Sequence, residues 1–326
     1  MTVYATNPAN TLPWREIVNG VRIQRFKRFA PSGSYFFSAD MILSLRKASF
    51  DVVHGHSYNS LPMHFSFLAT HKKLIFTTHF HSAGHSVFRN CLFSLFKPVG
   101  KMTLLQADKI IAVSEFEKRL LSKYFNLDRE RIVVIPNGLD LKEFAGIKRC
   151  RRPDRKTILY VGRLEAYKGP QTLIEALPLL DKNIVLEVVG KGPLRKTLEN
   201  QANNLGVQNR VLFFQDLSRH ELLQKYVDAD LFVLLSLQEA YSLVVAEALV
   251  AGTPCIVTNT TALTEWIDNN TCFGIDTPVR ASRLATLVNS IIDADLNGKP
   301  VFQERIGTKI PDWNSVTQQL EKVYQE

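Results

Sequence analysis

Short runs of β-branched and other apolar residues alternate with helical stretches along almost the whole chain. This alternation is typical of βαβ units, in which parallel strands are covered by helices on both faces. The runs hold few polar residues, as expected for strands that are buried on both sides. They lie at residues 2–6, 21–26, 51–56, 74–79, 109–114 and 132–136, then at 157–162, 184–190, 210–215, 231–236, 254–258 and 272–276. The pattern predicts an α/β protein with parallel sheets.

The length of the chain predicts two such sheets, because 326 residues exceed one ordinary core and suit two α/β domains. The stretch from Lys148 to Lys156 (KRCRRPDRK) is densely charged and contains a proline. This composition is typical of a linker between domains. We therefore expect a first domain at residues 1–147 and a second that begins at residue 148.

The amino-acid composition indicates in which cellular compartment the protein functions. Hydrophobic residues make up 45% of the chain and charged residues 22%, as in globular proteins. No apolar run approaches the ~18 residues that a membrane span requires, and the sequence opens with no signal-peptide pattern. Four scattered cysteines argue against a disulfide framework or a cysteine zinc site. These features predict a cytoplasmic protein.

The net charge of +9 is unevenly distributed: residues 1–145 carry the whole excess, and residues 146–326 are balanced. A one-sided basic surface favours an anionic partner, either nucleic acid, an acidic membrane or a phosphorylated substrate, although solubility alone also explains it. No basic motif interleaved with aromatic residues supports nucleic acid. The stretch Val87–Lys101 mixes bulky apolar residues with three cations. It is either an interfacial helix on a membrane or a core helix packed on the first sheet.

In open α/β sheets, ligands bind beyond the carboxyl ends of the strands, so polar residues at those positions are candidates. The most informative segment is EAYSLVVAEALVAGTPCIVT, Glu239 to Thr258. We expect Ser242 to cap a helix that runs to about Ala251. Apart from Glu247, the body of this helix is apolar on every side, which predicts that it is buried.

Glu247 has two interpretations, because a carboxylate in a buried helix needs a partner. The partner is either an arginine in a structural ion pair or the two hydroxyls of a ribose. In the second interpretation Glu239 lies in the preceding loop, within reach of a sugar. The backbone amides of Tyr241, Ser242 and Leu243 at the helix N-terminus then suit a diphosphate.

A second segment, GRLEAYKGPQTLIEAL, begins where a strand is expected to end at Gly162. Arg163 and Lys168 follow in a loop before an amphipathic helix. Two cations at the carboxyl end of a strand fit a diphosphate leaving group, with a planar fork from arginine and a point charge from lysine. Alone, such a pair is more often part of an ordinary solvated loop.

Three histidines, His79, His81 and His85, form an H-x-H-x3-H pattern. If the strand continues through them, the first two side chains face the same way, as metal ligands would. No carboxylate or cysteine lies close by in the sequence to complete a metal site. We therefore expect no metal here, and favour a polar wall of an active site over simple loop histidines.

Taken together, these segments resemble glycosyltransferase family 4, retaining enzymes of the GT-B fold. The motifs occur in the family's order: IPNGLD at Ile135, GRLxxxKG at Gly162, GKGPL at Gly190, ADLFVLLS at Ala229, an E-x7-E pair at Glu239 and Glu247, and W-x-x-V at Trp313. The resemblance runs from about Thr2 to the end of the chain. It implies two Rossmann-like doubly wound domains that face each other across a cleft.

The resemblance also implies roles for the residues of the second domain, residues 148–312. Arg163 and Lys168 would neutralise the departing nucleoside diphosphate, as a metal ion does in other glycosyltransferases. Glu247 would bind the ribose and Glu239 the donor sugar. The glycines of the site would line the donor, the last two near the base: Gly162, Gly190 and Gly192.

In the first domain, His79 falls where the family keeps a histidine that points at donor and acceptor. The turn at Asn137 would lie near the interdomain hinge, and the last helix, residues 313–326, would cross back onto the first domain. The implied partners are a nucleotide-sugar donor and a saccharide or lipid-phosphate acceptor, as in cell-envelope or glycolipid biosynthesis. The protein would be cytoplasmic and peripheral to the inner face of the membrane, with no separate cofactor and no nucleic acid.

The sequence departs from the family pattern at three places. Ala240 and Ser242 stand where glycines are usual, which narrows backbone freedom at the phosphate turn, and Gln215 replaces a glycine near the base. The family also opens with a strand, a glycine-rich loop and a long helix before the segment that matches Met1–Thr6. Their absence predicts an incomplete first domain of low stability, completed either by an upstream start or by a partner chain.

Two rival functions remain from the sequence. One is a sugar-nucleotide epimerase of the same fold, which would need a carboxylate-rich acid/base site that the His79 segment does not supply. The other is a non-catalytic nucleotide-binding or anion-binding protein, suggested by the basic first half. Tight binding of UDP or GDP that is insensitive to EDTA would favour the transferase over the second rival.

Overall fold

The computed structural model describes residues 1–7, 11–29, 37–81, 87–150, 154–294 and 310–326, and the side chains of residues 87–95 are outside this description. Contacts divide the chain into two compact units. The first unit contains Met1–Ile135 together with Gln319–Glu326, and the second contains Pro136–Gln318. Each unit is an α/β structure with its own sheet or sheets.

The first unit has two sheets instead of one. A three-stranded sheet has the order β1-β3-β2, and a four-stranded parallel sheet has the order β4-β5-β6-β7. The strands are β1 (Thr2–Asn7), β2 (Arg15–Val18), β3 (Val21–Lys27), β4 (Ser49–His56), β5 (Thr70–Thr77), β6 (Lys109–Ala112) and β7 (Ile132–Val134).

The smaller sheet differs from the expectation of purely parallel units. Strand β3 pairs in parallel with β1 and antiparallel with β2, which the sequence pattern did not indicate. In the described residues β1 and β4 share no backbone pairing, but their side chains meet: the rings of Tyr4 and Phe50 lie 6.1 Å apart. Both rings pack against the core of the unit. Backbone pairing depends on which edges meet in space, and hydropathy along the chain carries no such information.

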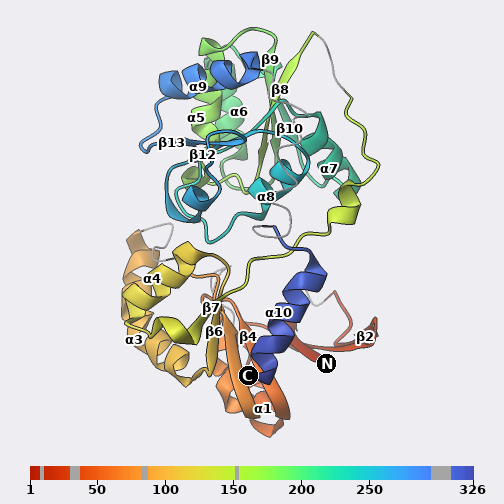
Figure 1. The fold of residues 1–326 in the computed structure, drawn as a ribbon, viewed down its shortest axis with the longest axis vertical. Coiled ribbons are helices and arrows are strands. Elements are labelled where there is room, and N and C mark those ends of the chain that lie inside the picture. The colour runs from red at the N-terminus through yellow and green to blue at the C-terminus, as the bar shows by residue number, and fades with distance from the viewer. Residues whose placement is uncertain (8–10, 30–36, 82–86, 151–153, 295–309) are drawn as a thin grey trace. The chain divides into compact units, whose positions relative to one another are not determined.

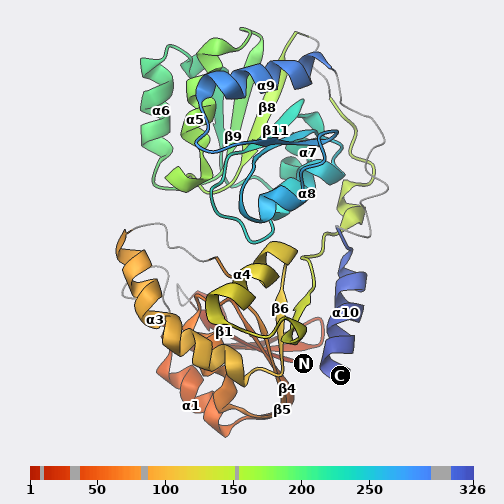
Figure 2. The ribbon, with the colours of Figure 1, turned by 60° about the vertical axis from the view of Figure 1, so that its left-hand side comes forward.

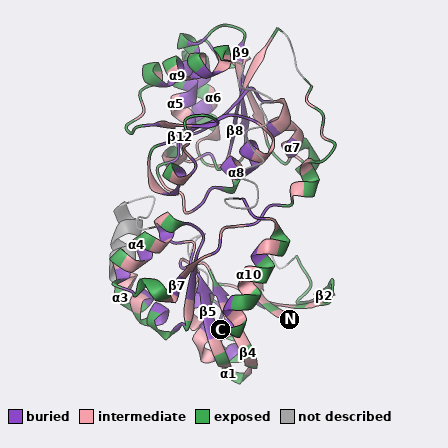
Figure 3. Ribbon diagram, in the orientation of Figure 1, coloured by how far each residue is buried: buried purple, intermediate pink, exposed green. Residues whose placement is uncertain are grey.

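The helices of the first unit are α1 (Ala39–Lys47), α2 (Leu61–Phe65), α3 (Val87–Gln106) and α4 (Glu115–Phe125). They cover an aromatic core in which the ring of Tyr58 lies 5.0 Å from that of Phe80 and 5.3 Å from that of Phe125. Helix α3 passes so close to this core that a Cβ on Gly100 would overlap the Tyr58 ring. Figure 3 shows buried residues concentrated in the parallel sheets and exposed residues on the outer sides of the helices, whereas β2 is largely exposed.

The second unit holds one parallel sheet with the order β10-β9-β8-β11-β12-β13. The chain starts in the middle, at β8, and winds first to one edge and then to the other, which is the doubly wound Rossmann arrangement. The strands are β8 (Lys156–Val161), β9 (Ile184–Val189), β10 (Val211–Phe214), β11 (Leu231–Leu234), β12 (Cys255–Thr258) and β13 (Cys272–Ile275).

Helices cover this sheet on both sides: α5, α6 and α9 lie together on one side, and α7 and α8 lie on the other (Figures 1 and 2). Their bounds are α5 (Pro170–Ala176), α6 (Arg195–Asn204), α7 (Arg219–Asp228), α8 (Leu243–Val250) and α9 (Ala281–Asp293). Short 3-10 turns link the elements of the chain at Ser66–Leu68, Arg129–Arg131, Leu141–Phe144, Ala166–Lys168, Leu177–Leu179, Gln208–Arg210 and Thr261–Glu265.

The last helix, α10 (Trp313–Gln325), begins in the second unit and ends in the first. Its start packs on the second unit, where a Cβ on Gly138 would lie 2.9 Å from the Trp313 ring. Its end lies against β4 and β5, where the Tyr324 hydroxyl and a ring nitrogen of His54 are 2.7 Å apart. The Nζ atom of Lys73 donates to the Val323 carbonyl at 3.4 Å.

The boundary between the units differs from the expected linker. It falls between Ile135 and Pro136, and the charged stretch from Lys148 belongs to the second unit. The guanidinium of Arg149 binds Asp230 at 3.2 Å, and the backbone N–H of Cys150 donates to Asp228 at 2.7 Å. Charge and proline content predicted a linker, but the Arg149 side chain and the Cys150 backbone have acidic partners just before β11 and at the end of α7.

All twelve strands predicted from the apolar runs are present, with ends shifted by a few residues, and β2 is an additional one. Two of the scattered cysteines, Cys255 and Cys272, stand opposite each other on β12 and β13, and both are buried. Across the described residues, no helix is long and apolar enough to cross a membrane.

Candidate active site

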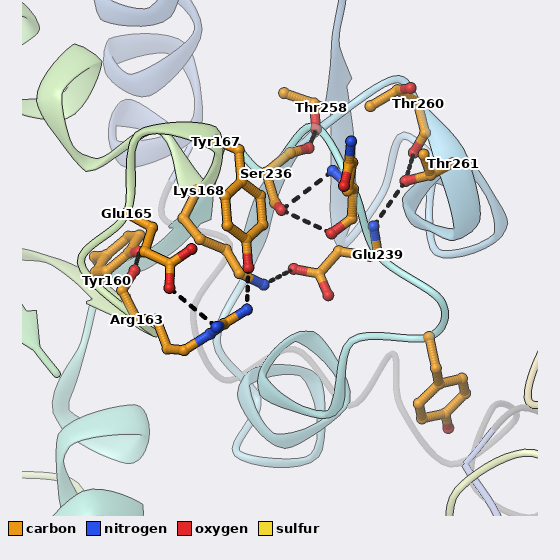
Figure 4. A network of polar contacts seen from close by, with 12 residues as sticks. Tyr160, Arg163, Glu165, Tyr167, Lys168, Ser236, Glu239, Thr258, Thr260 and Thr261 are labelled. Carbon is orange, nitrogen blue, oxygen red and sulfur yellow. Dashed lines mark hydrogen bonds and ion pairs between the residues drawn. The ribbon is translucent and has the colours of Figure 1, made fainter. Parts of the chain in front are cut away.

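The site of the second unit lies where the strand order reverses. Strands β8 and β11 are hydrogen-bonded neighbours in the sheet, yet the chain leaves them toward opposite edges. Such a switch point opens a crevice beyond the carboxyl ends of the two strands. The loop after β8 carries Arg163 and Lys168, and the loop after β11 carries Glu239 (Figure 4). The topology therefore brings together two motifs that lie about 70 residues apart in the chain.

The two loops are joined by an ion pair and a backbone hydrogen bond. The Nζ atom of Lys168 lies 2.5 Å from Oε1 of Glu239, and both side chains are nearly buried, with 14% and 13% of their surface exposed. The backbone N–H of Leu237 donates to the Tyr167 carbonyl at 2.8 Å. Between these contacts Gly169 adopts a left-handed φ of 74°, and a Cβ there would meet Leu235 at 2.6 Å. Lys168 and Glu239 are thus each held in place by a contact with the other loop.

Arg163 is the exposed member of the cation pair. Its Nη1 atom lies 2.9 Å from Oε1 of Glu165, and 60% of its side chain is exposed. Its Nη2 atom donates to the hydroxyl of Tyr167, and the hydroxyl of Tyr160 donates to the Arg163 carbonyl at 2.8 Å (Figure 4). Burial raises the pKa of Tyr167 to about 12, so its hydroxyl stays neutral at physiological pH. The guanidinium is thus held by two residues of its own loop, Glu165 and Tyr167.

The predicted glycines permit close packing of two neighbouring loops. A Cβ on Gly190 would lie 1.9 Å from the Gly162 carbonyl oxygen, and one on Gly192 would lie 2.4 Å from the Leu164 carbonyl oxygen. The backbone N–H of Leu164 in turn donates to the Lys191 carbonyl at 2.9 Å. These glycines therefore fix the position of the segment that carries Arg163.

The prediction that the Ser242 side chain caps helix α8 is wrong. Ser242 occupies the N-cap position, but it has a left-handed φ of 81° and its side chain makes no capping hydrogen bond. Its Oγ atom is buried and has no hydrogen-bond partner among the residues that the structure describes. A serine caps a helix from the extended region of backbone space, and this turn holds it elsewhere. The amides of Tyr241, Ser242 and Leu243 remain at the N-terminus of α8 as predicted.

Glu247 lies inside α8 with 7% of its surface exposed, as the apolar surroundings predicted. Its Oε1 atom accepts a hydrogen bond from Nη1 of Arg219, at the start of α7. Arg219 also binds Glu143 at 2.9 Å, on the 3-10 turn after the unit boundary. The structure thus contains the arginine partner of the first interpretation. Arg219 is thus shared by two carboxylates and 39% of its side chain is exposed, whereas only 10% of the Glu247 side chain is exposed.

His79 lies in the first unit, directly after β5. The strand ends at Thr77, so His79 and His81 are in a loop and not on a continuation of the strand. His79 has a left-handed φ of 46°, which turns the chain away from the strand direction. Burial and the neighbouring His56 lower the pKa of His79. The third histidine of the pattern, His85, lies outside the described residues.

The described residues contain no group of three or more histidine, cysteine or acidic side chains arranged to hold a metal ion. On β4, the rings of His54 and His56 stack with centroids 4.2 Å apart. The second ring nitrogen of His54 lies 2.7 Å from the Thr77 hydroxyl. Burial lowers the pKa of His54 to about 3, so this cluster is neutral at physiological pH.

The sequence analysis missed Glu117, a carboxylate with no exposed surface beside His79. It accepts hydrogen bonds from the residues on both sides of this histidine, Thr78 and Phe80. A signal was available, because Ser114 and Glu117 have the S-x-x-E spacing of a capping box. The serine does cap α4, at 3.1 Å from the Glu117 amide, but the glutamate turns into the protein.

Comparisons with known proteins agree with this architecture. Residues 1–143 match the model of the family described as Glycosyltransferase Family 4, and residues 147–307 match the family described as Glycosyl transferases group 1. A glycosyltransferase of Methanocaldococcus jannaschii is 28% identical, over 78% of this chain and 71% of its own length. Glycogen synthase of Mycobacterium tuberculosis is 31% identical, over 67% of this chain and 54% of its own.

Shorter matches are confined to part of the relatives. The D-inositol 3-phosphate glycosyltransferase of Mycolicibacterium smegmatis is 33% identical, over 49% of this chain and 40% of its own length. Among solved structures, sucrose-phosphate synthase from Thermosynechococcus elongatus has a TM-score of 0.80 at 20% identity, over 99% of this chain and 88% of that one. Anabaena HepE in complex with UDP-glucose has a TM-score of 0.74 at 19% identity, over 94% and 86%.

The two Rossmann-like units have the GT-B fold that these solved structures share. The chain belongs to the family 4 glycosyltransferases, with the group 1 family model matching its second unit.

Proposed function

We propose that this protein is a retaining, metal-independent glycosyltransferase that takes its sugar from a nucleoside diphosphate sugar. The acceptor is a saccharide or a lipid-linked phosphate. The ion pair between Lys168 and Glu239 carries the proposal, because it joins the two diagnostic motifs at the switch point of a Rossmann sheet. The retaining outcome and the lack of a metal follow the family resemblance.

Charge at the crevice suits a departing diphosphate. Arg163 and Lys168 each hold a carboxylate in this structure, at 2.9 and 2.5 Å. A diphosphate carries more negative charge than a carboxylate and can replace both as the partner. Cations already fixed at the position where charge develops stabilise the transition state without reorganisation. The amides at the start of α8 add a partial positive charge on the same side.

Release of Glu239 follows from donor binding. While Lys168 holds its carboxylate, Glu239 is an ion-pair partner and offers little to a sugar hydroxyl. A diphosphate that attracts Lys168 leaves the carboxylate of Glu239 to accept hydrogen bonds from the donor sugar. Glu247 binds the ribose by the same chemistry, in competition with Arg219. His79 of the first unit is the catalytic imidazole that the family resemblance implies, and burial and the neighbouring His56 lower its pKa.

Titration calorimetry with UDP and then GDP, in EDTA, tests the donor site. Lys168→Ala and Arg163→Ala should each weaken binding by roughly 10- to 150-fold, the range of a charge-assisted hydrogen bond. Arg283→Ala is the matched control, because Arg283 is also ion-paired at 2.9 Å and 59% exposed but lies on α9. Binding that needs added magnesium or manganese would contradict the proposal.

Measurements of donor binding and turnover distinguish the proposed roles of Glu247 and Glu239. Glu247→Ala should mainly weaken donor binding, whereas Glu239→Gln should mainly lower turnover, each by roughly 10- to 150-fold. Wild-type behaviour in both variants would remove the assignment. Product analysis distinguishes the rival epimerase, which returns an altered nucleotide sugar and needs no acceptor.

The proposal includes peripheral contact with the inner face of a membrane through α3 of the first unit. On the described part of this helix, Val99, Met102 and Leu105 are exposed by 48%, 67% and 47%. Their spacing of three residues places them along one face. Lys101 lies beside this face, as cations do in helices that lie on anionic lipid. The Nζ atom of Lys97 lies 4.1 Å from the centroid of the Tyr124 ring.

A further inference from the structure

Glu117 is fully buried at the start of α4. Burial of a charged carboxylate lowers the stability of a protein unless hydrogen bonds compensate for the lost water. Its own amide N–H is used by the helix cap, since it donates to the Ser114 hydroxyl at 3.1 Å. A cap needs no glutamate turned into the core. The side chain of Glu117 therefore has a separate role, which its hydrogen-bond partners identify.

Three donors surround this carboxylate. Oε1 accepts from the hydroxyl of Thr78 and from the backbone N–H of Phe80. Oε2 accepts from the backbone N–H of Val113 at 2.7 Å. An ionised carboxylate only accepts hydrogen bonds, so it matches a set made entirely of donors. Two of the three donors belong to the residues directly before and after His79.

The backbone at His79 needs such support. Its φ of 46° lies in the left-handed region, which a residue with a Cβ rarely adopts. Strained conformations of this kind persist only where the surroundings over-determine them. Here Phe80 is fully buried, with its ring 5.0 Å from that of Phe125, and Thr78 accepts a backbone hydrogen bond from Tyr58 at 2.7 Å. Glu117 joins these two anchored neighbours through a single oxygen atom.

We propose that Glu117 is a positioning residue, whose buried carboxylate holds the left-handed turn at His79 and so fixes the direction of the imidazole. The inference rests on the proposed function, in which this imidazole is catalytic. Glu117 itself touches neither. Its effect on the reaction passes through the two hydrogen bonds to Thr78 and Phe80.

The test uses the full-length chain with isotope-labelled histidine, and follows the His79 ring by NMR as pH changes. Loss of one signal in His79→Gln assigns the resonance. In Glu117→Ala the His79 resonance should shift, and its pKa should rise toward the ordinary value because the loop opens to water. Exchange of the Phe80 amide hydrogen should become roughly ten- to a hundredfold faster, the equivalent of one lost charge-assisted hydrogen bond.

Two milder variants cover the case in which Glu117→Ala fails to fold. Thr78→Val removes one of the two bonds to the loop and keeps the carboxylate. Glu117→Gln keeps one acceptor oxygen but turns an NH2 donor toward another donor. Both should move the His79 signal in the same direction by less. Ser114→Ala is the matched control, because it weakens the cap of the same helix and leaves the loop bonds intact.

Unchanged His79 titration and Phe80 exchange in a folded Glu117 variant would overturn the inference. So would an equal shift in Ser114→Ala, which would show that general loosening of α4 is enough. UDP titration separates this result from the proposed function. UDP binding should survive in every Glu117 variant, because its proposed contacts belong to the second unit, and its absence from the wild-type protein would count against the proposed function alone.

Discussion

At the scale of single residues, the chemistry of this chain depends on how each charge is partnered. Lys168 and Glu239 face each other, Glu247 has Arg219, and Glu117 has only uncharged donors. The first two arrangements are ion pairs near a surface that a ligand can rearrange. The carboxylate of Glu117 is closed to solvent, and this burial shifts its pKa.

Glu117 should make the stability of the first unit depend on pH. Burial, opposed by its three hydrogen bonds, raises the pKa of Glu117 from 4.5 to about 7. The folded state thus binds this proton more tightly than the unfolded state. The resulting stabilisation is complete below about pH 4.5 and is lost as pH rises through about 7, a change of about 3 kcal/mol in the free energy of unfolding.

Urea unfolding of wild type and Glu117→Gln, at pH 5 and pH 7.5, measures this contribution. The wild type should lose stability relative to the variant as pH rises. The difference between the proteins is the relevant quantity, because buried histidines such as His54 and His79 act in the opposite direction. A constant difference across this range would show that Glu117 does not titrate there.

At the scale of elements, the loops after β8 and β9 pack closely against each other, because glycines at the contact leave room for the neighbouring backbone. Gly192→Ala places a Cβ 2.4 Å from the Leu164 carbonyl oxygen, so a backbone segment must move. The expected loss of stability is about 1–3 kcal/mol. UDP affinity should fall as well, because the displaced segment carries Arg163.

Gly206→Ala is the control for this prediction, measured by the same melting curves and UDP titrations. Gly206 has a left-handed φ of 68° but nothing within 4 Å of a new Cβ, so the change costs strain without a clash. It should lower the melting temperature and leave UDP affinity unchanged. If both variants bind UDP equally well, the contact between the two loops does not position Arg163.

Helix α3 provides a prediction about membranes. Vesicles of phosphatidylcholine with phosphatidylglycerol should carry the protein upward in a flotation gradient, and vesicles without the anionic lipid should not. Met102→Glu with Leu105→Glu should abolish flotation. Leu179→Glu is the control, because Leu179 is similarly exposed, at 54%, on the second unit. No flotation in either lipid mixture would leave α3 as a core helix with an exposed side.

At the scale of the whole molecule, UDP should stabilise the second unit and leave the stability of the first unit unchanged. UDP at 100 times its dissociation constant stabilises the state that binds it by about 2.7 kcal/mol. Hydrogen exchange with UDP and EDTA should therefore show new protection within residues 160–250 and none in residues 1–135. A variant with both Arg163→Ala and Lys168→Ala should lose it. Protection that appears mainly in the first unit would place the nucleotide elsewhere.

Hydropathy and motif spacing along the chain predicted the α/β fold class and the loop positions of the charged residues. Twelve apolar runs became twelve strands, because a strand buried on both faces must be apolar throughout. The positions of Arg163, Lys168 and Glu239 beyond strand ends followed from the same pattern. These features are local: each depends on residues that are adjacent in the chain, so hydropathy and motif spacing suffice to find them.

Only the tertiary structure decided which groups became partners. The additional strand β2, the separation of the first unit into two sheets and the pairing of Glu247 with Arg219 all depend on contacts between distant segments. Glu117 is the clearest case, since its S-x-x-E spacing predicts a helix cap and its side chain instead reaches the His79 loop. A buried carboxylate accepts whatever donors the fold brings to it, and spacing along one helix does not specify them.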